Sequence, residues 1–505
     1  MRASHMVPAA VVLVALGAIG AAAQLGHPAA APRPVSSPAA IRQVAVTSAA
    51  RACPPAPGGA AAPVALLAGG ASAAGQGQVE LTALPPAGLP VRATGPVRTQ
   101  SPGALSLLTL PAAKPGGQQT AGQQTAGQQT AGQQATQAEQ GWSVAGGGVM
   151  AQGLEAELTQ SSGLASVRCA EPGSDLWFLG PGQQYGGSQV QLDLMNVDST
   201  AASVDVSIIN DSGQVQAGND NGITVPPHQT VTESLSSVAH GSSVVAIEVH
   251  TSIGRLAADV SAESHGVTSW LPSTAGPSRR LVIPGVPPSG STAGLFMADP
   301  GPSTAKVTVT AITPQGHISP FGSQSVDLPG QSASYVALSP LGGTTAALQI
   351  TSNVPVVAAV LVPGSGPGVL TAATAPISEQ AVVAGNTSSG GTAASVLLSA
   401  PGAAAQVRLT EIAPASRGGT SVTASQVLSV KAGRTLATPV KAPKGAKHDS
   451  AFALVITPLP GSGPLYAARV ETQGQNSVVS IIPAASALTT ISLPPVRDSY
   501  DAISP

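Results

Sequence analysis

The sequence predicts an all-β protein. We expect three tandem immunoglobulin- or fibronectin-like antiparallel β-sandwich domains after an N-terminal transmembrane or signal helix and a disordered linker. Apolar and polar residues alternate with a period of two in many short segments, which indicates half-buried strands. One such segment, Gln189–Gly213, has two relatives further along the chain. No stretch shows a sustained 3.6-residue period with capping residues, so we expect little helix.

The related segments keep one spacing. Val204, Val307 and Val407 occupy the same place in them, 103 (307 − 204) and 100 (407 − 307) residues apart. A pair of alanines recurs with nearly the same period, at residues 257–258, 358–359 and 467–468. A period of about one hundred residues indicates copies of a whole domain, because solenoid repeats are about 20 to 50 residues long. A propeller is the alternative, but its blades of about 40 to 50 residues are half this period.

These landmarks divide the C-terminal two thirds of the chain. Sandwich 1 is predicted over residues 141–272, sandwich 2 over 279–366 and sandwich 3 over 378–484, followed by a tail at 485–505. Seven short strands are predicted in sandwich 1, at residues 176–179, 189–195, 203–209, 222–225, 230–235, 244–250 and 256–261. Seven strands in under a hundred residues, without a crossover helix, favour an antiparallel sandwich.

The chain begins with a candidate export segment. Residues 1–26 have a basic start at Arg2 and then an uncharged run from Val7 to Gly26, which is typical of a signal peptide or a transmembrane anchor. We favour an anchor in the plasma membrane; the alternative is a cleaved signal, cut near Ala21-Ala22-Ala23, and a secreted protein. Both place the protein outside the cytoplasm.

Low-complexity sequence fills the stretch before sandwich 1. Residues 27–75 are rich in Ala, Pro and Gly and are predicted to form a flexible spacer. Residues 76–111 contain strand-like pieces and form a short β-rich segment. Residues 112–140 hold the repeated phrase GQQTA, which has no apolar face to bury and predicts disorder.

The only two cysteines, Cys53 and Cys169, flank this low-complexity region. Cysteines of an exported protein usually pair, so we expect a disulfide that ties the segment around Cys53 to sandwich 1. A bridge across a loop of this length stabilises a fold by roughly 4 to 5 kcal/mol at most. Two free thiols are the alternative if the export prediction is wrong.

Several short motifs resemble a known family. They are the Trp142 region with Ala151-Gln152-Gly153-Leu154-Glu155, then Cys169, Trp177-Phe178-Leu179-Gly180, and Trp270-Leu271-Pro272. Together they resemble an actinobacterial family of exported proteins known only as a domain of unknown function. The resemblance covers about residues 141–483 and implies a single N-terminal membrane segment, a cysteine pair and β-rich extracytoplasmic domains. It implies no activity and no catalytic residues. The GQQTA insertion departs from the family pattern.

Composition and motifs argue against several function classes. The net charge is −2 and only 9% of residues are charged, so no basic surface is expected for nucleic acid. Metalloprotease, phosphate-loop and serine-hydrolase motifs are missing, and we predict no catalytic, cofactor-binding or metal-ligating residues and no cofactor. The nearest approach to an acid/base or metal cluster is Glu248 and His250, with Asp259, Glu263 and His265 nearby. Alternation favours a solvated polar face for Glu248 and His250.

Aromatic residues are rare, at 2% of the chain, so the three around sandwich 1 stand out. Trp177, Phe178 and Trp270 are possible contacts for a partner protein or a sugar, because aromatic rings stack on both. The favoured interpretation is structural: Trp177 closes the end of sandwich 1, and Trp270 fills the joint to sandwich 2.

The function predicted from these features is that of a non-enzymatic extracytoplasmic cell-envelope protein, a rod of tandem β-sandwiches that acts as a binding or scaffold module. Its expected partners are the membrane, through the N-terminal segment, and an envelope polysaccharide or another exported protein. The alternative is a hydrolase or transferase acting on envelope polysaccharide, or its accessory subunit. That alternative predicts Asp175 and Glu248 at a cleft, about 5 to 9.5 Å apart. A passive spacer is a third possibility.

Overall fold

The structure is a computed structural model of the chain. It describes residues 42–56, 61–69, 77–91, 101–111, 140–159, 166–183, 189–215, 221–264, 267–288, 292–320, 325–338, 341, 343–364, 368–387, 390–417, 420–474 and 477–493. Strand makes up 65% of the described residues and helix 2%, which confirms the all-β prediction. The predicted N-terminal helix (1–26), the GQQTA stretch up to residue 139 and the last residues of the tail lie outside the described residues.

The chain divides into two compact units. The smaller unit joins residues 1–44 with 491–505, and its described part is the pairing of β1 (Arg42–Ala45) with β36 (Thr490–Leu493). There Gln43 Nε2 donates to Ser492 Oγ at 2.8 Å. The larger unit, Ala45–Thr490, holds the remaining strands.

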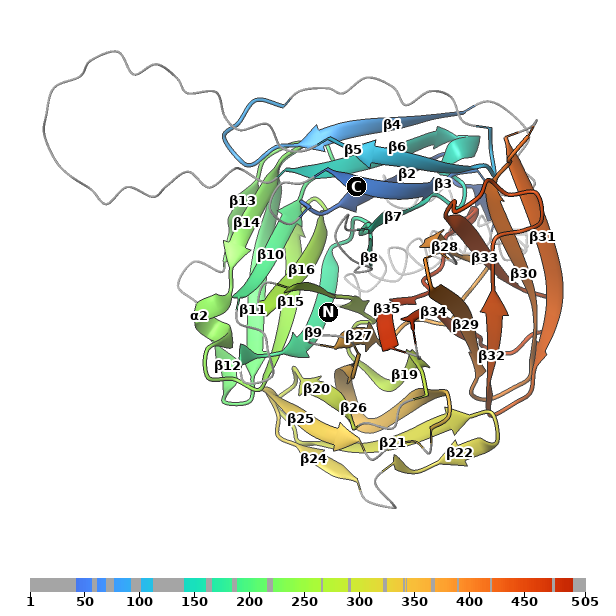
Figure 1. The fold of residues 1–505 in the computed structure, drawn as a ribbon. Helices are drawn as coiled ribbons and strands as arrows, with labels where there is room; N and C mark the ends of the chain where they lie inside the picture. The colour runs from blue at the N-terminus through green and yellow to red at the C-terminus, as the bar shows by residue number, and fades with distance from the viewer. Residues whose placement is uncertain are drawn as a thin grey trace, which may run out of the picture. The chain divides into compact units, whose positions relative to one another are not determined.

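Repeat 1 of the larger unit is a pair of antiparallel sheets (Figure 1, green). One sheet has the strand order β12-β11-β15-β9-β18, with β13 also on β11, and the other has the order β14-β10-β16-β17. Consecutive strands such as β10 and β11 lie in different sheets, as in a sandwich. The elements are β9 (Asp175–Pro181), β10 (Gln189–Met195), β11 (Ala202–Asn210), β12 (Gly213–Val215), β13 (Ile223–Val225), β14 (Thr230–Ser234), α2 (Ser236–Ala239), β15 (Val244–Ile253), β16 (Ala257–Ser264), β17 (Val267–Leu271) and β18 (Ser273–Thr274).

The local sequence explains these strands. In β11, Val204, Val206 and Ile208 are buried while the residues between them are partly exposed, as a period of two requires. The predicted turns are also present. Asn196 Oδ1 accepts from the backbone N–H of Asp198 at 2.9 Å, so the side chain closes the turn after β10.

Repeats 2 and 3 follow the same plan. In repeat 3 the two sheets have the orders β28-β33-β30-β31 and β32-β29-β34-β35. In repeat 2 the long strand β26 runs through both sheets and joins them. The strands of repeat 2 are β19 (Ser278–Val286), β20 (Ala293–Asp299), β21 (Ala305–Thr313), β22 (Gly316–Ile318), β24 (Val326–Leu328), β25 (Ser332–Leu338), β26 (Ala346–Val362) and β27 (Val369–Ala372). Those of repeat 3 are β28 (Ala381–Asn386), β29 (Thr392–Ala400), β30 (Ala405–Pro414), β31 (Ser421–Val430), β32 (Arg434–Val440), β33 (Phe452–Pro458), β34 (Tyr466–Gln473) and β35 (Ser477–Pro483).

Each of these repeats has its own hydrophobic core. The three valines that define the sequence period are fully buried in three separate clusters: Val204 in the first, Val307 in the second and Val407 in the third. A domain that has been copied is expected to keep its core position in each copy. The core position that defines the hundred-residue period is therefore kept in all three segments.

The strands before residue 170 form a further copy, the N-terminal repeat. Its sheets have the orders β2-β6-β4 and β5-β3-β7-β8. The second order matches β14-β10-β16-β17 of repeat 1 when strands are taken in chain sequence. The elements are β2 (Ser48–Cys53), β3 (Ala62–Leu67), β4 (Gly77–Leu84), β5 (Leu105–Leu110), β6 (Gly141–Gly148), the 3-10 helix η2 (Val149–Ala151), β7 (Glu155–Thr159) and β8 (Ser166–Arg168).

This repeat changes two predicted boundaries. Strands β2 and β3 lie inside the stretch predicted as a flexible spacer (27–75), so that prediction was wrong for their residues. Strand β6 pairs with β2 and β4, so Gly141 belongs to the N-terminal repeat and the first strand of repeat 1 begins at Asp175. The spacer prediction failed because composition carries no information about a partner strand almost ninety residues away.

Neighbouring repeats pack on one another within the larger unit. The core of repeat 1 continues into Phe296 and Leu370 of repeat 2, and the core of repeat 2 continues into repeat 3. The N-terminal repeat packs on repeat 3 through a cluster containing Leu67 and Val382. It also packs on repeat 1 through a cluster containing Leu84. The sequence predicted independent sandwiches along a rod, but the repeats are instead joined to one another by apolar contacts.

Candidate functional site

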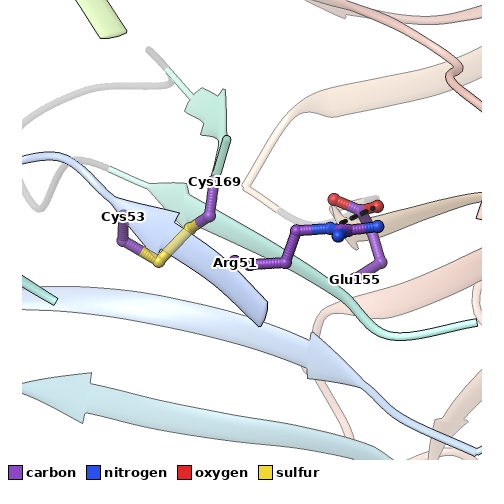
Figure 2. The surroundings of a disulfide bond; sticks show 4 residues. All are labelled: Arg51, Cys53, Glu155 and Cys169. Atoms are coloured by element: carbon purple, nitrogen blue, oxygen red, sulfur yellow. Dashed lines mark ion pairs between the residues drawn. A yellow bond between two sulfur atoms is a disulfide. The ribbon is translucent and has the colours of Figure 1, made fainter. Parts of the chain in front are cut away.

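The predicted disulfide between Cys53 and Cys169 is present (Figure 2). Cys53 ends β2 and Cys169 directly follows β8, so the bond closes a loop of 116 residues that contains the other strands of the N-terminal repeat. Both cysteines are fully buried. The neighbouring residues Ala52 and Ala170 exchange two backbone hydrogen bonds of 2.9 and 2.7 Å. The disulfide therefore ties the two ends of this repeat together inside its core.

A buried ion pair lies beside the disulfide. Figure 2 shows Arg51 of β2 reaching Glu155 of β7, with 3.5 Å between Nε and Oε2. The same carboxylate oxygen accepts from Arg168 Nη2 at 2.6 Å, and Arg51 Nη2 lies 3.3 Å from Glu171. Glu155 and Arg51 are almost completely buried. A buried charge is tolerated only when it is paired, and here two arginines share one glutamate.

A second buried ion group links the N-terminal repeat to repeat 3. Glu157 of β7 accepts from Arg469 Nη2 of β34 at 2.9 Å and from the backbone N–H of Gly385 at 2.8 Å. Arg469 Nη1 lies 2.7 Å from Glu471, which in turn accepts from the N–H of Thr387 at 2.8 Å. Burial raises the pKa of Glu157 from 4.5 to about 7; the Arg469 charge opposes this rise and the Glu471 charge adds to it.

Gly385 makes this contact possible. A Cβ atom built on Gly385 would lie 3.0 Å from the carboxyl carbon of Glu157, which is closer than ordinary carbon contacts. Glycine leaves room for this approach, whereas a larger residue would require the Glu157 carboxylate to shift by a few tenths of an ångström. The two repeats, 228 positions apart at these residues, are thus joined by polar contacts as well as by the apolar cluster.

A third acidic pair lies where repeat 1 meets the N-terminal repeat. Asp193 of β10 and Asp259 of β16 are direct cross-strand partners, and both are buried. Burial raises the pKa of Asp259 well above 3.8; the Asp193 charge raises it further and the Arg168 charge lowers it. Arg168 also pairs with Glu155, so the acidic pair and the disulfide region belong to one electrostatic group.

We call these side chains the buried charge network. It contains five buried carboxylates and three arginines: Glu155, Glu157, Glu471, Asp193, Asp259, Arg51, Arg168 and Arg469. Burial opposes ionisation and raises the pKa of two of these acids, Glu157 and Asp259. In a chain with 9% charged residues, this concentration at the contacts of the N-terminal repeat marks the candidate functional region.

Sequence reasoning missed the network. Glu155 and Glu157 alternate with apolar residues in β7, a pattern that normally places glutamates in solvent. One available signal was the alanine-pair landmark. The residue that follows the pair is Asp259 in repeat 1 and Arg469 in repeat 3, but Val360 in repeat 2. Charged residues at a strand position that is apolar in a sister copy indicate a special environment.

The aromatic residues predicted as possible partner or sugar contacts are core residues. Phe178 is fully buried, and Trp177 and Trp270 are 3% and 8% exposed. Trp177 and Phe178 lie in the core of repeat 1. Trp270 lies in the core of the N-terminal repeat with Cys53 and Cys169. A sugar cannot stack on rings that are covered by protein, so the contact assignment is corrected. Trp270 fills a joint, but it is the joint to the N-terminal repeat.

The polar residues singled out in repeat 1 separate into two places. Asp175 pairs with His250 across β9 and β15, and Glu248 lies two residues further on the same face. Burial and the Asp175 charge raise the pKa of Glu248; a hydrogen bond from Ser207 and the His250 charge lower it. Asp259 belongs to the network on the other sheet, Glu263 pairs with Thr268 across β16 and β17, and His265 is outside the described residues.

The described residues offer neither a metal-binding cluster nor a membrane-spanning helix. Within these ranges no group of three His, Cys, Asp or Glu side chains could hold a metal ion. In the same part of the chain, no helix has the length and apolar character needed to cross a membrane.

A family model matches the chain. The model of a family of unknown function, DUF5719, matches residues 120–441, which is more than half of the 505 residues. This range includes Cys169, all of repeat 1 and repeat 2, and most of repeat 3. No curated protein matches the chain. The chain belongs to DUF5719, a family whose function is not known.

Proposed function

We propose that this protein is a non-enzymatic extracytoplasmic protein of the cell envelope, tethered by its N-terminal segment, whose repeats act as a scaffold or binding module. The observation that carries the proposal is the buried disulfide between Cys53 and Cys169. Disulfides form and persist in oxidising compartments and are rare in the reducing cytosol. A bond enclosed in the core supports folding outside the cytoplasm.

The sequence before the described residues agrees with this location. Residues 1–26 combine a basic start with a long uncharged run, the pattern of an export signal or anchor. Such a segment delivers the chain to a compartment where the two cysteines are oxidised.

The contacts among the repeats support a scaffold role. The buried charge network includes contacts between repeats. Glu157 accepts a hydrogen bond from Arg469 in repeat 3, and Arg168 interacts with Asp259 in repeat 1. A buried ion pair fixes one geometry, because breaking it leaves an uncompensated charge. A body held in this way presents its surfaces to an envelope polysaccharide or an exported protein in a constant arrangement.

Thiol trapping in cells tests the location. Cells that express the full chain are lysed in acid and alkylated with a maleimide polymer, before and after reduction. We expect no shift in gel mobility without reductant and two additions with it, in the membrane fraction. The single variant Cys53→Ala is the control and should show one addition without reductant. Two reactive thiols in a cytosolic fraction would refute the proposal.

The mature N-terminus and crosslinking test the tether and the partner. Retention of Met1 or Met6 in the membrane fraction would support an anchor, and a start at Gln24 would indicate release. Crosslinking on intact cells should then capture a discrete glycan or exported protein. A protein that is crosslinked to nothing across a range of reagents would contradict the binding role.

One observation favours an envelope-sugar hydrolase as a second candidate. Asp175 and Glu248 are diagonal neighbours on adjacent strands, a relation that separates side chains by about 7 Å, within the range for paired glycosidase carboxylates. Glu248 also has a raised pKa, as a general acid requires. Sugar release from purified envelope should then be abolished in Glu248→Gln and unchanged in Glu80→Gln, which alters an exposed glutamate. Equal release by both variants and the wild type would eliminate this candidate.

A further inference from the structure

The contact between repeat 1 and the N-terminal repeat contains two carboxylates that face one another. Asp193 and Asp259 are opposite residues in the antiparallel pair β10–β16, where side chains on one face stand about 5 Å apart. Their exposed fractions are 1% and 5%. Two like charges at this separation, away from water, cannot both persist.

The hydrogen bonds of the pair are unequal. Asp193 Oδ1 accepts from Thr232 Oγ1 at 2.7 Å and from Gln191 Nε2 at 3.2 Å, so this side chain is held as an acceptor. Asp259 Oδ2 is buried and has no hydrogen-bond partner among the described residues. A protonated Asp259 would carry a donor toward the neighbouring carboxylate and satisfy both groups.

The charged groups around the pair do not neutralise two carboxylates, so one proton is needed. Arg168 approaches from β8 and lowers the cost of one negative charge on Asp259. Arg168 is itself paired with Glu155 at 2.6 Å and also experiences the charge of Glu171. Arg51 is engaged by the same two glutamates. Among the described residues, the one arginine that acts on Asp259 is therefore shared with other acids.

We propose that Asp193 and Asp259 share a single proton, and that its release to solvent weakens the contact between repeat 1 and the N-terminal repeat. Strand β16 bears Asp259 and is adjacent to β17, whose Trp270 lies in the core of the N-terminal repeat. Loss of the proton leaves two negative charges in the buried contact, and separating the repeats restores their hydration. The contact is thus a proton-dependent joint, which goes beyond the scaffold role.

The sign of the pH dependence follows from the direction of the shift. The pKa of Asp259 is raised in the folded protein, so its contribution to stability is fully present below the unfolded value near 4 and is lost as pH rises through the folded value. Ordinary paired carboxylates have the opposite dependence. Acidification toward pH 5 should therefore tighten this joint.

The test uses the full chain and the variant Asp259→Asn, which keeps the shape and removes the titration. In the wild type, tryptophan emission should shift to the red and limited proteolysis at the boundary between the N-terminal repeat and repeat 1 should accelerate between pH 5 and pH 9. In Asp259→Asn both changes should be absent or reduced at least threefold. The control is Asp327→Asn, at an exposed aspartate of β24, which should behave as the wild type. The same pH response in Asp259→Asn as in the wild type would overturn the proposal.

Infrared spectroscopy provides a readout that does not depend on stability. The wild type at pH 7 should show a protonated-carboxyl band that is missing from Asp259→Asn, and Glu157→Gln identifies the separate band expected from Glu157. Absence of the Asp259 band would refute proton sharing. Calcium is a further test at pH 8. If it raises the melting temperature of the wild type but not that of Asp259→Asn, the two carboxylates bind a cation and not a shared proton, and the proposal is overturned.

Discussion

Removing the Cys53–Cys169 disulfide should lower the free energy of unfolding by about 5 kcal/mol. The bond closes a loop of 116 residues, and the entropy that such a crosslink removes from the unfolded chain is about 16 cal/mol/K, or about 5 kcal/mol at 25 °C. The loop contains β3 to β8, so the loss should be concentrated in the N-terminal repeat and its contacts.

Urea unfolding followed by tryptophan fluorescence measures this loss. Trp142 and Trp270 both lie in the same core as the disulfide, so they report on its repeat. The wild type is unfolded and reduced, then refolded with and without reductant, which keeps the sequence constant. The variant Cys53→Ala/Cys169→Ala should be insensitive to reductant. A difference of less than about 1 kcal/mol between oxidised and reduced protein would refute the argument from loop entropy.

Further predictions concern the contacts between repeats. Burial raises the pKa of Glu157 from 4.5 to about 7, so its contribution to the free energy of unfolding is complete below pH 4.5 and is lost as pH rises through about 7, a span of about 3 kcal/mol. The stability of Glu157→Gln should therefore depend less on pH across this range, as denaturation at several pH values would show. A dependence as steep as that of the wild type would contradict the assignment. Arg469→Met leaves two buried carboxylates without their cation and should lower the free energy of unfolding by about 3 to 5 kcal/mol at pH 7, and by less at pH 5. Calorimetry at both pH values checks this, and an equal loss at the two values would contradict it. Gly385→Ala should lower the melting temperature, because the new Cβ meets Glu157, and Glu157→Ala should relieve that loss in the double variant. Trp270→Ala should cost about 3 to 5 kcal/mol and increase proteolysis between repeat 1 and the N-terminal repeat; wild-type resistance would show that Trp270 does not hold that joint.

Part of the fold was predictable because its cause is local. Alternating side chains in β10 and β11 specify strands, since each strand buries one face and exposes the other. The hundred-residue period predicted three copies because each copy must keep its core valine, and Val204 and Val407 are indeed buried in separate cores. The disulfide was predictable because the chain has only two cysteines.

The N-terminal repeat was not predictable because its pairings are long-range. Strand β6 bonds to β2 across almost ninety residues, and nothing in the composition of residues 48–53 distinguishes a strand from a spacer. The aromatic residues raised the same difficulty. Trp270 could face solvent or protein until a neighbouring repeat packed over it, and that packing is a tertiary event.

By itself the sequence determined the strand class, the threefold period and the cysteine pair, because these depend on residue spacing and residue number. Only the tertiary structure decided that Glu157 meets Arg469 and that Asp193 meets Asp259. The first meeting depends on contact between the N-terminal repeat and repeat 3, and the second on the register of β10 against β16. The sequence pattern predicts that a carboxylate on the polar face of a strand is solvated. Where another sheet covers that face, the carboxylate is buried, and its pKa and role change.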